Sequence, residues 1–114
     1  MQRKTKKFCT LYIIRHGQSE SNQKEVLGQK NSKLSTEGIA QAELRAEEFK
    51  SIRFDAIFSS SFRRAKETAD LIAKKQNVEE VITTTLLNER NWGKWENVFS
   101  EKERQTFKKL REQY

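Results

Sequence analysis

The chain has no proline, a single cysteine and a single histidine among its 114 residues. One cysteine cannot form an internal disulfide, which excludes a small disulfide-stabilised secreted domain. Cys9 lies within an apolar run, and we predict that it packs in the core. No apolar segment reaches the roughly 18 residues that a transmembrane helix needs, and no signal-peptide cleavage pattern follows the basic start of the chain. These absences favour a cytoplasmic protein in a reducing compartment.

Basic residues outnumber acidic ones by 23 to 16, which gives a formal net charge of +7 at pH 7. Such an excess is common in proteins that bind nucleic acids. In the segment 100–113, however, acidic and basic residues are interleaved, which is typical of a solvated helix face with local ion pairs. We therefore predict neither a nucleic acid nor a membrane as a partner. The length fits one domain, residues 1–114, with a modest core.

Apolar residues are grouped in segments that alternate between strand-like and helix-like patterns. The predicted strands are 8–14, 55–60 and 81–87, and the predicted helices are 34–51, 62–75 and 98–114. The first strand is nearly all apolar, so it should be covered on both faces, and the first helix should be capped by Ser35 or Thr36. Strands that alternate with helices indicate βαβ units, and therefore an α/β fold with a mostly parallel sheet and flanking helices.

Polar segments follow each of the three predicted strands. They are Arg15-His16-Gly17, residues 59–65 and residues 86–96. In an open α/β sheet, ligands bind outside the carboxyl ends of the strands, and those ends meet at one edge of a parallel sheet. We therefore expect the histidine to face a cleft there, with arginines from the first two segments beside it.

This combination of residue types suits phosphate chemistry. An arginine guanidinium can hold two phosphate oxygens at once and offset negative charge in the transition state. A neutral imidazole, the main form of histidine at pH 7, can attack phosphorus directly. Gly17 permits tight turning and close approach of the backbone to the ligand. Ser19 and Asn22 lie one helical turn apart, where they could add donors beside a helix start.

Four successive segments resemble the signatures of the histidine phosphatase superfamily, in its phosphoglycerate mutase-like branch: RHGQSESN, LSTEGIAQA, SSSFRRAKETA and LNERNWGKWE. The resemblance implies a Rossmann-like three-layer α/β fold. It also implies a metal-independent phosphomonoester hydrolase that acts, without a cofactor, on a small phosphorylated substrate through a phosphohistidine intermediate. Two alternatives stay open. One is an isomerase of the phosphoglycerate mutase type, which LNER followed by an aromatic residue and glycine favours, although WGKWE favours the phosphatases. The other is a phosphate-binding remnant without turnover.

The resemblance further implies roles for individual residues. His16 would be the nucleophile that becomes phosphohistidine, and Arg15 and Arg64 would hold the phosphoryl group. Glu89 would donate a proton to the leaving group and later activate water. Further substrate contacts would come from Ser19, Asn22, Arg90 and Trp92.

Two of these residues also have simpler interpretations. Arg64, which occupies the family's arginine position in preference to Arg63, could instead pair with Glu67 or Asp70 on its own helix. Glu89 could be an ordinary surface carboxylate.

The chain departs from the family pattern because it has no second histidine. Family members carry a second catalytic histidine at the end of a later strand, which lies between the first two strands of the sheet. We therefore expect the N-terminal part of a longer domain, or a naturally shortened relative, with an incomplete sheet. Loss of one preorganised donor costs about 10²–10³ in rate, so activity of these 114 residues should be impaired. Homodimer formation is left open.

Overall fold

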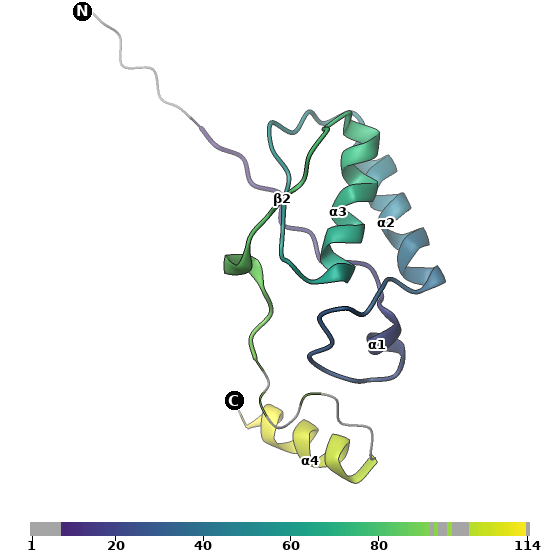
Figure 1. The fold of residues 1–114 in the computed structure, drawn as a ribbon, viewed down its shortest axis with the longest axis vertical. Coiled ribbons are helices and arrows are strands. Elements are labelled where there is room, and N and C mark those ends of the chain that lie inside the picture. Colours follow the sequence, from purple (N-terminus) through teal and green to yellow (C-terminus); the bar gives the residue numbers. More distant parts are fainter. Residues whose placement is uncertain (1–7, 92, 94–95, 97–100, 114) are drawn as a thin grey trace, which may run out of the picture.

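The computed structural model describes residues 8–91, 93, 96 and 101–113. In chain order, its elements are α1 (Glu20–Gln23), α2 (Thr36–Glu48), β1 (Phe58–Ser59), α3 (Arg63–Gln76), β2 (Ile82–Thr83), the 3-10 helix η1 (Thr85–Leu87) and α4 (Glu101–Glu112). The two longest helices, α2 and α3, lie side by side, and the short sheet lies next to α3 (Figure 1). Within the described residues, no helix combines the length and the apolar character needed to cross a membrane.

The sheet consists of β1 and β2, which run parallel with Phe58 opposite Ile82. Parallel strands need a crossover connection, and α3 provides it. This βαβ unit confirms the predicted α/β class with a parallel sheet. Both strands are shorter than predicted. β2 ends where the Thr84 hydroxyl accepts a hydrogen bond from Leu86 N–H and the chain turns into η1.

Small side chains line the faces of α2 and α3 that are buried. The hydroxyl of Ser35 accepts a hydrogen bond from Gly38 N–H at the start of α2, which confirms the predicted cap. The buried residues are Gly38, Ala42 and Ala46 on α2, and Arg64, Thr68, Ala69, Ile72 and Ala73 on α3. Because most of these side chains are short, the two helices can approach closely, and their contact forms most of the core.

The predicted first strand, residues 8–14, is not formed. Within the described part of the chain, no strand pairs with this segment. Leu11 and Ile13 are 78% and 94% exposed, because a strand of this kind becomes buried only when neighbouring elements cover both of its faces. Cys9 is exposed as well, so its predicted place in the core is wrong for the same reason.

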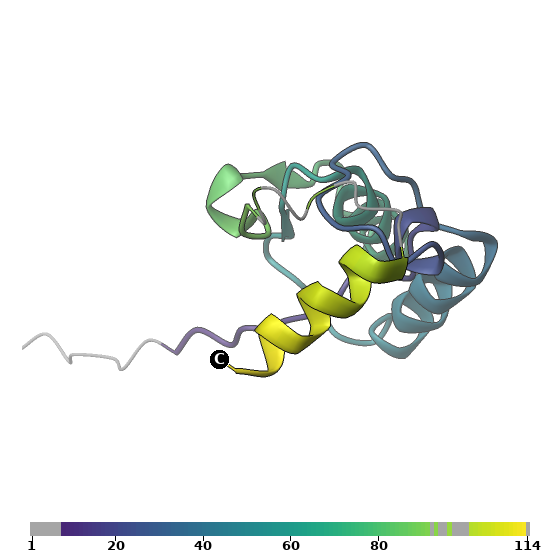
Figure 2. The same cartoon turned by 90° about the horizontal axis from the view of Figure 1, so that it is seen from below.

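The last helix, α4, lies within the predicted range 98–114. Figure 1 shows it below α1, and Figure 2, seen from that side, shows it in front of the rest of the chain. Its Leu110 side chain is exposed, so this residue does not extend the core between α2 and α3.

Candidate active site

The segment that carries the lone histidine is hydrogen-bonded to both long helices. Gly17 N–H donates to the Thr68 hydroxyl of α3 at 3.1 Å, and that hydroxyl donates to the Arg64 carbonyl at 2.8 Å. On the other side, Gln18 N–H donates to the side-chain oxygen of Gln41 on α2 at 2.9 Å. Thr68 is not recognisable in the sequence as a site residue, because a threonine on a helix face gives no sign of a partner 51 residues away.

Two glycines bring this segment against α2, backbone to backbone. A Cβ atom at Gly17 would overlap the carbonyl of Gly38, and a Cβ atom at Gly38 would overlap the carbonyl of Gln18. The close approach seen at Gly17 is thus to α2, whereas the expected approach to a ligand stays a prediction. Gly38 is not identified by the sequence analysis, although a glycine in a helix, where alanine is the better helix former, is a usable signal of such a contact.

The hydrogen bonds of His16 define which ring nitrogen carries the proton. Nδ1 lies 2.6 Å from the Gly17 carbonyl oxygen, which can only accept, so Nδ1 carries the hydrogen. Nε2 then holds a lone pair and accepts a hydrogen bond from Arg64 Nε at 3.2 Å. Burial of the ring is the main cause that lowers the pKa of His16 below its ordinary 6.5. The guanidinium groups of Arg64 and Arg15 act in the same direction, while the Gly17 carbonyl and Glu89 oppose them.

Arg64 is the centre of the site and is only 3% exposed. Besides its contact with His16, its Nη1 donates to the Gln29 carbonyl at 2.8 Å and its Nη2 donates to Glu89 Oε2 at 2.5 Å. The guanidinium carbon also lies 4.7 Å from the centre of the Phe62 ring. These contacts fix the orientation of the Arg64 guanidinium, which binds both His16 and Glu89.

The simpler interpretation of Arg64 as a helix ion pair does not hold. Arg63 pairs with Glu67 at 2.8 Å, and Lys66 pairs with Asp70 at 3.2 Å, both on the surface of α3. Arg64 points the other way, into the site. The helix period explains this difference, because adjacent residues on a helix face directions about 100° apart.

Ser19 and Asn22, predicted to contact phosphate, form a capping box at the start of α1. Asn22 N–H donates to Ser19 Oγ at 3.1 Å, and Ser19 N–H donates to Asn22 Oδ1 at 3.0 Å. Ser19 is 0% exposed, and its hydroxyl also contacts Ser21. Asn22 is exposed and lines the same cavity as His16. The structure therefore brings Asn22 to the site and encloses Ser19 beneath it.

A cavity of about 510 Å³ opens on one side of His16. Its lining includes the predicted site residues Arg15 and Asn22. Thr68 from α3 and Gln41 and Arg45 from α2 line it as well. Arg15 is exposed there. Of the two further predicted contacts, Arg90 is exposed, and Trp92 falls outside the described residues.

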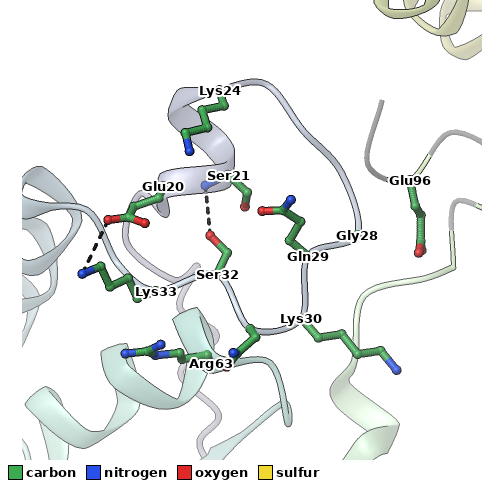
Figure 3. A pocket seen from close by; sticks show the side chains of 11 residues that line it. Glu20, Ser21, Lys24, Gly28, Gln29, Lys30, Ser32, Lys33, Arg63 and Glu96 are labelled. Atoms are coloured by element: carbon green, nitrogen blue, oxygen red, sulfur yellow. Dashed lines mark hydrogen bonds and ion pairs between the residues drawn. The ribbon is translucent and has the colours of Figure 1, made fainter. Parts of the chain in front are cut away.

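A larger hollow of about 780 Å³ lies between α1, the loop 24–33 and the start of α3 (Figure 3). Figure 3 shows Lys33 paired with Glu20 across its edge, at 3.7 Å, and Arg63 at its base. None of His16, Arg64 and Glu89 lines it. Among the described residues, no group of three or more His, Cys, Asp or Glu side chains is arranged to hold a metal ion.

Comparison with known proteins gives consistent matches. The family model for the histidine phosphatase superfamily (branch 1) matches residues 11–114. A 2,3-bisphosphoglycerate-dependent phosphoglycerate mutase of Bartonella tribocorum is 39% identical over 89 residues, which cover 74% of this chain and 43% of the mutase.

Solved structures show the same relationship. The mycobacterial glucosyl-3-phosphoglycerate phosphatase matches with a TM-score of 0.71 and 27% identity, over 81% of this chain and 44% of the phosphatase. The phosphoserine phosphatase of Entamoeba histolytica matches with a TM-score of 0.65 and 32% identity, over 84% of this chain and 44% of that one. The chain thus spans less than half the length of these relatives.

Proposed function

Because the chain belongs to the histidine phosphatase superfamily, we propose that it hydrolyses phosphomonoesters through a phosphohistidine at His16. The observation that carries the proposal is the state of the imidazole. Its Nδ1 hydrogen is donated to the Gly17 carbonyl, its lowered pKa keeps it neutral at pH 7, and its Nε2 lone pair is directed at Arg64. A lone pair beside a guanidinium is the arrangement that an attack on an arginine-bound phosphoryl group needs.

In the proposed reaction, Arg64 and Arg15 hold the oxygens of the phosphoryl group. Phosphoryl oxygens carry negative charge and accept the Arg64 hydrogen bonds more strongly than an imidazole nitrogen does, so substrate binding releases Nε2. Nε2 then forms a bond to phosphorus while the ester P–O bond breaks. Glu89, protonated once the phosphoryl group has taken over its contact with Arg64, supplies that proton to the leaving alkoxide and becomes a carboxylate. In the second step, Glu89 takes a proton from water, which attacks phosphorus, breaks the P–N bond and releases inorganic phosphate.

Two other functions have specific support. A phosphoglycerate mutase-type isomerase is favoured by the 39% identity to the Bartonella mutase and by Glu89-Arg90 within LNER. A binding remnant without turnover is favoured by the single histidine, since the family's second histidine has no counterpart in these 114 residues. The substrate we propose is a small phosphorylated molecule, as the names of the relatives indicate for those proteins. Cytoplasmic location and homodimer formation stay predictions.

The proposal is tested by trapping the intermediate from a radiolabelled phosphomonoester. We expect a phosphoprotein that is labile to acid and stable to alkali, and that is absent from His16→Ala. Arg63→Ala, which alters an exposed arginine on the same helix, is the matched control and should label normally. Release of phosphate supports the hydrolase, whereas formation of an isomer supports the mutase. Undiminished labelling of His16→Ala would remove the histidine from the mechanism, and no labelling of the unaltered chain would favour the remnant.

A further inference from the structure

Asn88, the residue directly before Glu89, makes two hydrogen bonds to a single residue across the site. Its Oδ1 accepts from Ser61 N–H at 2.8 Å and from Ser61 Oγ at 2.9 Å. Asn88 also donates its own N–H to the Thr85 carbonyl at 3.0 Å, which ends η1. One side-chain oxygen therefore joins the end of η1 to the turn between β1 and α3.

The two residues that this contact joins are close in sequence to the two ends of the Arg64–Glu89 ion pair. Ser61 precedes Arg64 by three residues, and Asn88 is the neighbour of Glu89. The Asn88–Ser61 contact therefore sets the separation of the backbone segments from which both charged side chains extend.

The two leucines of η1 contribute little packing to this segment. Leu86 of η1 is 92% exposed, and Leu87 is exposed too. Exposed leucines contribute little burial energy, so the hydrogen bonds of Asn88 and the ion pair of Glu89 have a larger share in positioning the end of η1. The bonds of Asn88 are solvent-exposed, but they are made to a turn that leads directly into buried Arg64.

We infer that Asn88 is a positioning residue, which through its paired hydrogen bonds to Ser61 holds Glu89 at Arg64 and within reach of the leaving group. That Asn88 places Glu89 rests on geometry alone. That this placement matters for catalysis rests on the proposed function. The side chain at position 88 must carry an oxygen that accepts from both the backbone N–H and the hydroxyl of Ser61. Aspartate can do the same, whereas leucine, of similar size, cannot.

The position of Glu89 can be followed through the titration of His16. Because His16 is the only histidine, its imidazole signals in NMR are unambiguous. The Glu89 carboxylate favours the protonated imidazole, so moving it away should lower the titration midpoint of His16. Four proteins form a double-mutant cycle: the unaltered chain, Asn88→Leu, Glu89→Gln and the double variant. We expect both single changes to lower the midpoint. The double variant should have the same His16 midpoint as Glu89→Gln, because Asn88 acts only through Glu89.

Two further variants keep the test decisive. Asn88→Asp retains the acceptor and adds negative charge, so its midpoint should not fall. Ser61→Ala removes one of the two bonds and leaves the backbone, so it should give a smaller shift in the direction of Asn88→Leu, and it replaces that variant if Asn88→Leu does not fold. An unchanged midpoint in Asn88→Leu or in folded Ser61→Ala, or additive shifts in the double variant, would overturn the inference.

The catalytic meaning is tested separately, by turnover. Asn88→Leu should slow hydrolysis of alkyl phosphates by about 10²-fold or more, and that of nitrophenyl phosphate by less than about tenfold, as expected when a general acid is displaced. Equal losses on both substrates would contradict the positioning role. The NMR cycle does not depend on turnover, so failure of the proposed function and failure of this inference are distinguishable.

Discussion

The Nε atom of Arg64 lies 3.2 Å from Nε2 of His16, although the two residues are 48 positions apart in the chain. A buried guanidinium is thus in direct contact with the nitrogen that would attack phosphorus. Any change in the charge at Arg64 should therefore be felt by the proton equilibrium of His16.

The titration of His16 is the first consequence. Its pKa should lie below 6.5, chiefly because the ring is buried, with Arg64 and Arg15 adding to the effect. Replacing Arg64 by glutamine should raise that pKa, whereas Arg63→Gln, on the exposed face of α3, should leave it unchanged. NMR of the single imidazole measures both changes directly. A midpoint at or above 6.5 in the unaltered chain would contradict the geometry.

The same lowered pKa predicts how stability depends on pH. Between the folded-state pKa and 6.5, the unfolded chain binds more protons at this position than the folded chain does, so stability rises with pH in that window. On acidification, the free energy of unfolding should fall through this window and the contribution of His16 should then become constant. Urea unfolding at several pH values measures it, with His16→Gln as the control that lacks this part of the dependence. An identical pH dependence in both proteins would be the contrary result.

Glu89 should matter according to the leaving group. A general acid contributes most when the leaving group is a poor one, such as an alkoxide, and less for an activated phenolate. Glu89→Gln should therefore slow hydrolysis of alkyl phosphates far more than that of nitrophenyl phosphate. Steady-state rates on the two substrates give the comparison, and equal losses would indicate that the carboxylate serves only to hold Arg64.

Thr68 connects α3 with the segment that carries the histidine. Thr68→Val keeps the shape but leaves the buried Gly17 N–H without an acceptor, which should cost about 1–3 kcal/mol in the free energy of unfolding. Thr68→Ser keeps the oxygen and loses one methyl group, so it should cost about 1 kcal/mol or less. Denaturant unfolding of the two variants decides the matter. A serine variant as unstable as the valine variant would show that packing, and not the hydrogen bond, is important.

The exposed apolar residues of 8–14 should bind a hydrophobic dye and promote association of the chain. Lysine at both Leu11 and Ile13 should lower dye fluorescence and association while leaving the free energy of unfolding nearly unchanged. Tyr12→Ser is the contrasting variant, because Tyr12 packs edge-on against the ring of Phe49, and it should be destabilised. Unchanged dye binding in the double-lysine variant would place the exposed apolar surface elsewhere.

The sequence is informative about the centre of the site because short motifs there have distinct chemistry. Arg64 and Glu89 follow the two predicted strands that form, and a parallel sheet brings such segments to one edge. His16 follows the predicted strand that is not formed, and its segment is held instead by hydrogen bonds to α2 and α3. Local periodicity likewise predicts α2 and α3, whose apolar faces repeat at helical spacing. These features depend on neighbours within one or two helical turns.

Other features of the structure cannot be predicted from the neighbouring residues in the sequence. The exposure of Leu11 and Ile13 depends on whether other strands cover them, which the composition of 8–14 does not reveal. The contact of Asn88 joins residues 27 positions apart, and an asparagine after an apolar run is compatible with many turns. Hydrogen bonds between distant segments are thus the part of this site that sequence patterns miss.

The unit β1–α3–β2 is built from residues close together in the chain, whereas the bond between Gly17 and Thr68 closes a loop of 51 positions. Closing a longer loop costs more conformational entropy, and contacts between nearby residues form sooner during folding. The strand–helix–strand unit should therefore assemble first and present a finished surface of α3. The peptide that carries His16 would dock onto that surface afterwards, so the proposed nucleophile should reach its place at a late stage of folding.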